Sequence, residues 1–248
     1  MKVSIITVCF NSVATIRQTI ESVLSQTHED IEHIIVDGGS KDDTMEIVGE
    51  YENRLGVIVS EPDNGLYDAM NKGVQLASGD VVGILNSDDF FESGNVIETV
   101  VSELKRNPEL DVVFGKVVFV NPYDLGRVVR HYNAEKFKPW KLRFGWMPPH
   151  PGTFVKRSAY NKVGKYRTDL KIAADYEFFV RLFLTHSASY KFIDKVIVRM
   201  RTGGVSTEGL QSSLRLNREI VAACRENGVY TNLALVLSKL PFKLAELR

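Results

Sequence analysis

The chain has 248 residues, of which 44% are apolar and 25% are charged. This length suits one large α/β domain, or one domain with an appendage, and the composition is that of a folded protein rather than a disordered or fibrous one. The 31 basic residues balance the 31 acidic ones, so nothing in the overall charge predicts nucleic acid as a partner.

Strand-like sequence begins almost at the first residue, and we expect no signal peptide before it. No apolar run approaches the roughly 20 residues that a membrane-spanning helix needs. The two cysteines, Cys9 and Cys224, lie in apolar runs and are expected to be buried thiols in a reducing compartment. We therefore expect a cytoplasmic protein, which leaves room for contact with the inner face of the plasma membrane.

The first half of the chain alternates short apolar runs with segments of helical spacing. Strands are expected over 3–8, 31–36, 57–60 and 81–85. Helices are expected over 13–24, 42–51, 67–77 and 96–105. This alternation predicts an α/β fold with a mostly parallel, Rossmann-like sheet and helices on both faces.

The second half is more mixed. Its expected strands are 112–120, 127–132 and 190–200, the first two joined as a hairpin around Pro122-Tyr123-Asp124. Its expected helices are 175–185 and 208–226, while 133–149 shows no period and is interpreted as a loop. The chain is accordingly divided into a domain over 1–206, with halves 1–110 and 111–206, and a C-terminal helical segment over 207–248.

Acidic residues follow three of the predicted strands, where ligands bind in doubly wound sheets. They are Asp37, Glu61 with Asp63, and Asp88 with Asp89. Adjacent carboxylates repel each other, and a fold that places them together often supplies a divalent cation with a nucleoside diphosphate. Asp88 and Asp89 also fit a helix N-cap, and Asp37 fits either a turn cap or a contact with a nucleobase or ribose.

Five other polar residues each allow more than one interpretation. Asn71, on a helix, fits either a phosphate or sugar contact or an ordinary helix face. Asp175, in a first helical turn, fits either a favourable helix-dipole position or a general base. His150, between prolines, fits a metal ligand, a phosphate contact or an acceptor contact. Arg199 and Arg201 fit either diphosphate contacts or a solvated strand end.

In order and spacing, these segments together resemble the family 2 inverting glycosyltransferases with the GT-A fold. The resemblance extends from Val3 to about Ser206. The motifs that carry it are Ile5-Ile6-Thr7-Val8-Cys9-Phe10-Asn11, Ser22-Val23-Leu24-Ser25-Gln26-Thr27, Asp37-Gly38-Gly39-Ser40-Lys41-Asp42-Asp43-Thr44, Glu61-Pro62-Asp63-Asn64-Gly65, Ala69-Met70-Asn71-Lys72-Gly73, Ala77-Ser78-Gly79-Asp80, Leu85-Asn86-Ser87-Asp88-Asp89 and Ala174-Asp175-Tyr176-Glu177. The subgroup is similar to bacterial enzymes that build O-antigen, capsule or exopolysaccharide repeat units.

The resemblance implies roles for particular residues. The end of the first strand, from Val8 to Phe10, and Asp37 would hold the nucleobase, usually uracil. Asp88 and Asp89 would contact the ribose and a Mg²⁺ or Mn²⁺ ion that bridges the diphosphate. Asp175 would be the base of a single displacement that inverts the anomeric carbon.

The implied reaction moves a hexosyl or N-acetylhexosaminyl group from a nucleotide-sugar, usually a UDP-sugar, to a hydroxyl of a saccharide acceptor. That acceptor would be linked to a lipid such as a polyprenyl diphosphate. A nucleotidyltransferase is a weaker alternative, because no glycine-rich phosphate loop follows the first strand. A non-catalytic protein that binds sugar nucleotides is a further alternative.

The chain departs from the family pattern at three points. Ala174 stands where many members have Glu, and Asn86 replaces an Asp. Arginines occupy the segment near Arg199 and Arg201 where some relatives carry a His that completes the metal's ligands. The metal would then be held more loosely, or His150 would take that place.

Leucines and basic residues alternate in the C-terminal segment 230–248. One interpretation is a basic amphipathic helix that lies on anionic lipid. The other is a terminal helix that packs on its own domain or on a second subunit of a homo-oligomer.

Overall fold

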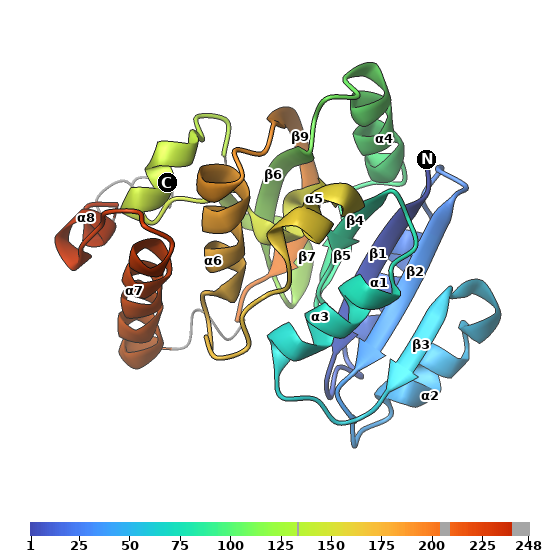
Figure 1. The fold of residues 1–248 in the computed structure, drawn as a ribbon. Helices are drawn as coiled ribbons and strands as arrows, with labels where there is room; N and C mark the ends of the chain where they lie inside the picture. Colours follow the sequence, from blue (N-terminus) through green and yellow to red (C-terminus); the bar gives the residue numbers. More distant parts are fainter. Residues whose placement is uncertain (133, 204–208, 240–248) are drawn as a thin grey trace.

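A twisted sheet with helices on both faces organises the chain (Figure 1). The computed structural model describes residues 1–132, 134–203 and 209–239. The strands are β1 Val3–Cys9, β2 Ile31–Asp37, β3 Val57–Ser60, β4 Val81–Ile84, β5 Asp89–Phe91, β6 Val112–Asn121, β7 Asp124–Tyr132, β8 Thr153–Lys156 and β9 Tyr190–Arg201. The α-helices are α1 Ile16–Leu24, α2 Thr44–Gly49, α3 Leu66–Leu76, α4 Val96–Arg106, α5 Arg157–Val163, α6 Ala174–Val180, α7 Gly209–Glu226 and α8 Leu233–Leu237.

The strand order is β3-β2-β1-β4-β8-β6-β9-β5, and β7 pairs with β6 outside this path. The four strands of the first half run parallel, as the βα alternation predicted. Strand β8 is antiparallel to both β4 and β6, whereas β9 returns parallel to β6. The predicted α/β fold is confirmed, with the parallel arrangement strongest in the first half.

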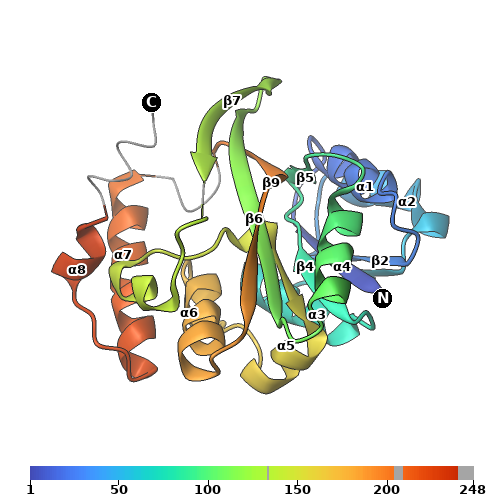
Figure 2. The same cartoon turned by 90° about the horizontal axis from the view of Figure 1, so that it is seen from above.

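The alternation of side chains along β1 distributes the core over both faces of the sheet. Ile6 and Val8 face a cluster that also contains residues of α3, α5 and α6. Val3 and Ile5 face the opposite cluster, which includes the apolar side of α4. Figure 2 shows these helices on the two sides of the sheet.

Several short elements were not predicted. Strands β5 and β8 and helix α5 have no separate signal in the sequence. The segment expected to be a loop over 133–149 contains the 3₁₀-helix Pro139–Phe144, and His150–Gly152 forms another. The helix expected over 175–185 begins at Ala174 and finishes as the π-helix Arg181–Thr185.

The C-terminal helices pack on the rest of the chain as far as the structure describes them. Ile220, Ala223 and Cys224 of α7 and Val236 of α8 belong to the same buried cluster as the residues of α6. The Lys239 ammonium group donates to the carbonyl of Gly145, 3.2 Å away. The remaining part of the predicted amphipathic helix, 240–248, lies outside the described residues, and the division at 206 stays a prediction.

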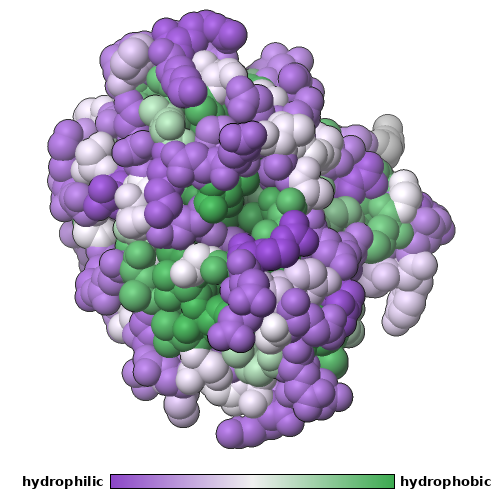
Figure 3. Space-filling model, turned by 90° about the vertical axis from the view of Figure 1, so that its right-hand side faces the viewer, coloured by the Kyte–Doolittle hydropathy of each residue, from purple (hydrophilic) through white to green (hydrophobic). Residues whose placement is uncertain are grey.

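Cys9 and Cys224 are buried and free, as predicted. No helix within the described residues is both long and apolar enough to cross a bilayer. Figure 3 views the molecule from the side of α2, β3 and α4, where polar residues surround separate apolar patches. On this side β3 ends the sheet, and its Val57, Ile58 and Val59 are partly exposed.

Candidate active site

The register of the parallel strands gathers the predicted ligand residues at one edge of the sheet. Cys9 pairs with Asp37, and Asp37 pairs with Ser60, so the ends of β1, β2 and β3 are level. Phe10, the first residue after β1, is 59% exposed, whereas Val8 within the strand is buried. Phe10 follows directly after Cys9, whose Sγ lies 3.8 Å from Asp37 Oδ1.

The carboxylate of Asp37 is 1% exposed and is held by local donors. It accepts hydrogen bonds from the backbone N–H groups of Gly39 and Ser40 at 3.1 Å, and from the Ser60 hydroxyl at 2.7 Å. The Ser40 hydroxyl also donates to it. The turn-capping interpretation of Asp37 is thus correct, and its contact with a nucleobase stays a prediction.

Helix α1 and the loop after β1 fix the acidic loop that follows β4. The hydroxyl of Thr19 donates to the carbonyls of Ser87 and Asp89, at 2.9 and 2.7 Å. The hydroxyls of Ser12 and Ser87 lie 2.8 Å apart. The backbone of the acidic pair is therefore placed before any ligand arrives.

The two carboxylates of this loop lie at different depths. Asp88 is half-buried, whereas Asp89 is 1% exposed. Asp89 Oδ2 accepts from the amide of Asn86 at 3.2 Å. Burial raises the pKa of both carboxyl groups, and the neighbouring charge of Asp88 raises the pKa of Asp89 further.

These side chains fit a divalent cation. Asp89 Oδ1 and Asn86 Oδ1 are buried oxygens without a hydrogen-bond partner in the described chain. Hard cations bind such oxygens, and Mg²⁺ commonly takes one or two carboxylates, with substrate phosphates and water as its other ligands. No group of three His, Cys, Asp or Glu side chains among the described residues could complete a metal site without substrate.

The two arginines of β9 differ in what they contact. Arg201 donates to the carbonyl of Asp88 and to Gln18, and its guanidinium group lies 5.2 Å from the ring centre of Phe90. Arg199 instead forms a bidentate ion pair with Glu92, at 2.5 and 2.9 Å. Arg201 therefore supplies positive charge at the acidic loop, whereas the charge of Arg199 is already neutralised.

The candidate base, Asp175, lies in the first turn of α6. Its Oδ1 accepts from the backbone N–H of Tyr176 at 2.7 Å and lies 3.3 Å from the Tyr67 hydroxyl of α3. Its Oδ2 has no hydrogen bond within the described residues. Burial raises the pKa of Asp175 to about 6, although these two hydrogen bonds oppose the rise.

Two predicted site residues, Asn71 and His150, are buried and form hydrogen bonds within the fold. The amide of Asn71 donates to the carbonyl of Tyr166 at 2.9 Å and accepts from its N–H at 2.8 Å. Asn71 is also buried, and it joins α3 to the segment before α6. Its contact with the nucleotide stays a prediction.

His150 is likewise buried, in a 3₁₀-turn. Its Nε2 lies 3.0 Å from the hydroxyl of Tyr166, and burial lowers its pKa to about 4, so the ring is neutral at neutral pH. Asp88, Asp89 and His150 do not form a metal-binding group among the described residues. The described residues alone thus give no support to His150 as a metal ligand, and its contact with diphosphate or acceptor stays a prediction.

Comparisons with known proteins identify the family and its fold. The model of the family described as "Glycosyl transferase family 2" matches residues 4–164. The chain belongs to this family. An uncharacterized glycosyltransferase of Mycobacterium tuberculosis is 35% identical over 187 residues, which are 73% of this chain and 69% of the relative.

Solved structures share the fold of this family 2 glycosyltransferase. TarS of S. aureus, in complex with UDP-GlcNAc, has a TM-score of 0.72 at 20% identity, over 97% of this chain and 72% of TarS. The mannosyltransferase PcManGT from Pyrobaculum calidifontis, in complex with GDP-Man and Mn²⁺, has a TM-score of 0.68 at 18% identity. That match covers 99% of this chain and 72% of the other.

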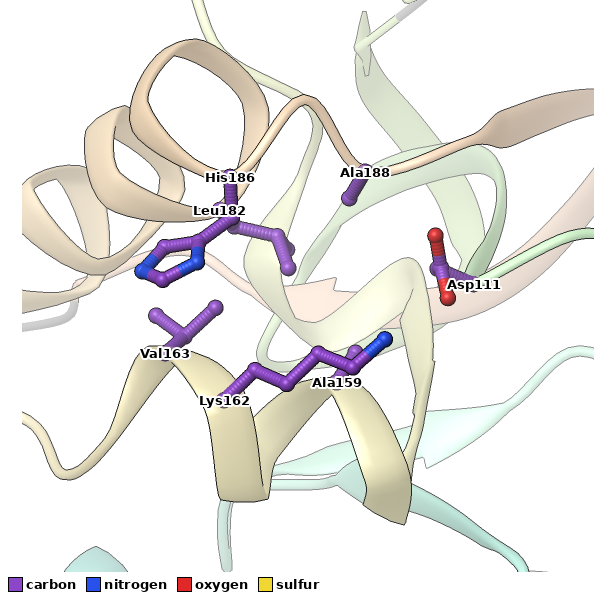
Figure 4. A pocket seen from close by; sticks show the side chains of 7 residues that line it. All are labelled: Asp111, Ala159, Lys162, Val163, Leu182, His186 and Ala188. Carbon is purple, nitrogen blue, oxygen red and sulfur yellow. The ribbon is translucent and has the colours of Figure 1, made fainter.

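A small pocket lies at the opposite edge of the sheet, at the start of β6 (Figure 4). It is lined by Asp111, Ala159, Lys162, Val163, Leu182, His186 and Ala188, and its volume is about 30 Å³. A space of this size holds about one water molecule rather than a nucleotide.

Three residues of the site were missed from the sequence. Gln18 and Thr19 are polar positions inside the helical pattern of α1, and Tyr67 follows Gly65 at the start of α3. Their contacts with Arg201, the acidic loop and Asp175 join segments far apart in the chain. A polar side chain at helical spacing is the only signal that they carry.

Proposed function

We propose that this family 2 glycosyltransferase is an inverting, metal-dependent enzyme. It transfers a hexosyl or N-acetylhexosaminyl group from a UDP-sugar to a hydroxyl of a lipid-linked saccharide in bacterial surface polysaccharide synthesis. The observation that carries the proposal is the environment of Asp175. One of its oxygens is held by Tyr176 and the other is unpaired among the described residues, in a carboxyl group whose pKa is raised to about 6.

Such a carboxylate suits a general base near neutral pH. In the proposed reaction, Asp175 Oδ2 takes the proton of the acceptor hydroxyl. The acceptor oxygen bonds to the anomeric carbon from the face opposite the nucleotide, and the bond from that carbon to the phosphate oxygen breaks. The electron pair leaves with the nucleoside diphosphate, and the anomeric configuration inverts.

The donor would bind at the carboxyl ends of β1, β2 and β4. Phe10 would stack on the base beside Asp37, and Asp88 would contact the ribose. Asp88 and Asp89 would hold Mn²⁺ or Mg²⁺, which when bound neutralises charge on the diphosphate. The donors in the TarS and PcManGT structures, and the Mn²⁺ in the latter, support this assignment. Arg201 would keep the acidic loop in place.

A basic aromatic surface supports the lipid-linked acceptor. It consists of Lys138, Trp140, Lys141, Arg143 and Tyr230. Trp140 and Tyr230 are 55% and 66% exposed. Lys141 lies 5.8 Å from the Trp140 ring centre, and Arg143 lies 5.7 Å from that of Tyr230. Exposed aromatic rings among cations suit the headgroup region of an anionic membrane, so we place the membrane contact here.

The configuration of the product tests the proposed reaction. Purified enzyme is supplied with Mn²⁺, a panel of UDP-sugars and saccharide acceptors, and the new anomeric centre is read by NMR. We expect configuration opposite to that of the donor, and no product when EDTA replaces the metal. A product that retains configuration would refute the single displacement. If neither transfer nor release of free sugar occurs, the protein only binds its nucleotide.

A further inference from the structure

Helix α7 holds the backbone that leads into the candidate base. The carboxylate of Glu219 accepts hydrogen bonds from three consecutive backbone N–H groups. Lys171 donates to its Oε1 at 3.2 Å, while Ile172 and Ala173 donate to its Oε2 at 2.9 Å each. These residues precede α6, which begins at Ala174, so their N–H groups have no partners in the helix and Glu219 supplies the acceptor that they need.

Tyr67 holds the same segment from the other side. Its hydroxyl lies 2.5 Å from the carbonyl oxygen of Ile172 and 3.3 Å from Asp175 Oδ1. The backbone of Ile172 is therefore bound through its N–H by α7 and through its carbonyl by α3. This clamp lies immediately before Ala174 and Asp175, so its geometry fixes where the carboxylate of Asp175 points.

Glu219 lies on a helix that is packed into the main core. The next residue, Ile220, and Ala223 on the same helix are at most 2% exposed and belong to the main core cluster. At the end of α7, the amide of Asn227 donates to Glu177 Oε1 of α6 at 3.1 Å. Contacts that follow Glu219 in the chain thus attach α7 to α6.

We propose that Glu219 is a positioning residue for the transfer reaction, which orients the start of α6 and whose negative charge keeps Asp175 a strong base. This rests on the proposed role of Asp175. The family model matches residues 4–164 and the motifs of the resemblance end before residue 207, so neither includes Glu219.

The charges around Asp175 support this role. Burial is the largest cause of its raised pKa, and the charge of Glu219 adds to the rise. The hydrogen bonds from Tyr176 and Tyr67 act in the opposite direction. Tyr67 and Tyr166 also interact electrostatically with Asp175, and burial raises the pKa of both phenols well above 10, so they stay neutral.

Two substitutions separate position from charge. Glu219→Gln keeps an oxygen that accepts from Ile172 and Ala173 but removes the charge. We expect the acid limb of its kcat/KM profile to move about half a unit toward lower pH, because the pKa of Asp175 falls. Glu219→Ala removes the acceptor as well. We expect its kcat to fall about tenfold or more with donor affinity unchanged, because a misplaced base is costly.

Glu226→Gln is the matched control. Glu226 lies on the same helix and pairs with Arg167, away from the N–H groups before α6. Hydrogen–deuterium exchange of residues 171–176 gives a readout without substrate. Exchange should speed up in Glu219→Ala and remain normal in the control. The assay uses the donor and acceptor that give product in the NMR experiment.

The inference is overturned if both Glu219 variants fold, keep wild-type kcat and pH profile, and protect residues 171–176 as the wild type does. Failure of the proposed function has a different signature, because Asp175→Asn would then retain turnover. Should Glu219→Ala fail to fold, the acid limb of Glu219→Gln decides alone. If the acid limb of Glu219→Gln lay at the same pH as that of the wild type, Glu219 would have no electrostatic effect on Asp175, and the inference would be overturned.

Discussion

At the scale of single residues, the candidate site carboxylates differ in their burial and in their hydrogen-bond partners, and so in the chemistry that each one suits. Asp37 is surrounded by hydrogen-bond donors and caps a turn. Asp89 is buried with one oxygen unpaired among the described residues, which suits a cation. Asp175 has one oxygen bound and a raised pKa, which suits proton transfer. In the proposed reaction the same functional group would thus serve a structural, a metal-binding and a basic role.

The raised pKa of Asp175 predicts the pH dependence of transfer. Its pKa rises from 3.8 to about 6, so the carboxyl group is protonated, and inactive as a base, below that pH. We expect kcat/KM to fall to half near pH 6 on the acid side and to reach a plateau above it. Steady-state rates measured from pH 5 to pH 8 on the order of every half unit would show this limb.

Asp175→Asn provides the complementary measurement. It should abolish transfer and leave donor binding intact. Burial raises the pKa of Asp175 in the folded state, so holding this carboxyl group charged at neutral pH costs folding free energy. The neutral amide of Asn removes that cost, and the variant should therefore not unfold at a lower temperature. Asp169→Asn, on a surface carboxylate that pairs with Arg167, is the control and should leave the acid limb in place. A plateau that continued well below pH 6 in the wild type would contradict the assignment.

At the scale of elements, close contact between α3 and β1 brings the loop after β3 to the ligand edge. Gly73 of α3 lies against Ile6 of β1, where an added Cβ would be 2.4 Å from Ile6 Cγ2. The helix approaches the strand only because no side chain stands between them. This packing fixes α3, and with it Tyr67 at the site of Asp175.

Gly73→Ala should therefore destabilise the fold, although alanine favours helices. Overpacking of this kind costs about 1–3 kcal/mol. Gly49→Ala, at the end of α2, is the matched control. No atom lies within 4 Å of its added Cβ, so it should be neutral or stabilise by up to about 1 kcal/mol. Urea unfolding of both variants measures the difference, and equal stabilities would show that α3 shifts without cost.

The elements of the first half were predictable because each carries its own periodic signal. Strands β1 to β4 are short apolar runs between turn residues, and the acidic motifs follow their ends. Strand β5, in contrast, covers only Asp89–Phe91 and exists because β9 pairs with it more than a hundred residues later. No local pattern predicts such a partner.

The side-chain roles show the same division. Asp88, Asp89 and Asp175 could be chosen from the sequence because their positions in predicted elements and their place in the family pattern coincide. Whether a polar side chain already has a hydrogen-bond or ion-pair partner depends on residues that are distant in the sequence. Tyr166 binds both Asn71 and His150, and Glu92 pairs with Arg199, and the sequence gives no sign of any of these contacts.

At the scale of the whole molecule, α7 packs on α6, and α8 packs on α7 and on the 3₁₀-helix Pro139–Phe144. Residues from both helices lie in the main core cluster, and Thr231 between them donates to the carbonyl of Arg143. This packing brings Tyr230 against Arg143 and so completes the basic aromatic surface. A membrane contact here would not require the C-terminal segment to form a free amphipathic helix.

The basic aromatic surface should bind vesicles that contain anionic phospholipid more tightly than neutral ones. Each lysine near such a surface contributes about 1 kcal/mol, so the Lys138→Gln, Lys141→Gln double variant should bind roughly 30-fold more weakly. The single variant Trp140→Ala should also bind more weakly than the wild type. Its loss of affinity should not depend on salt concentration, because the Trp140 ring contributes through burial of apolar surface rather than through charge. Lys105→Gln with Lys162→Gln, two exposed lysines elsewhere, removes the same charge and should have little effect. Co-sedimentation measures all four proteins; an equal loss in both double variants would assign the attraction to overall charge instead of to this surface.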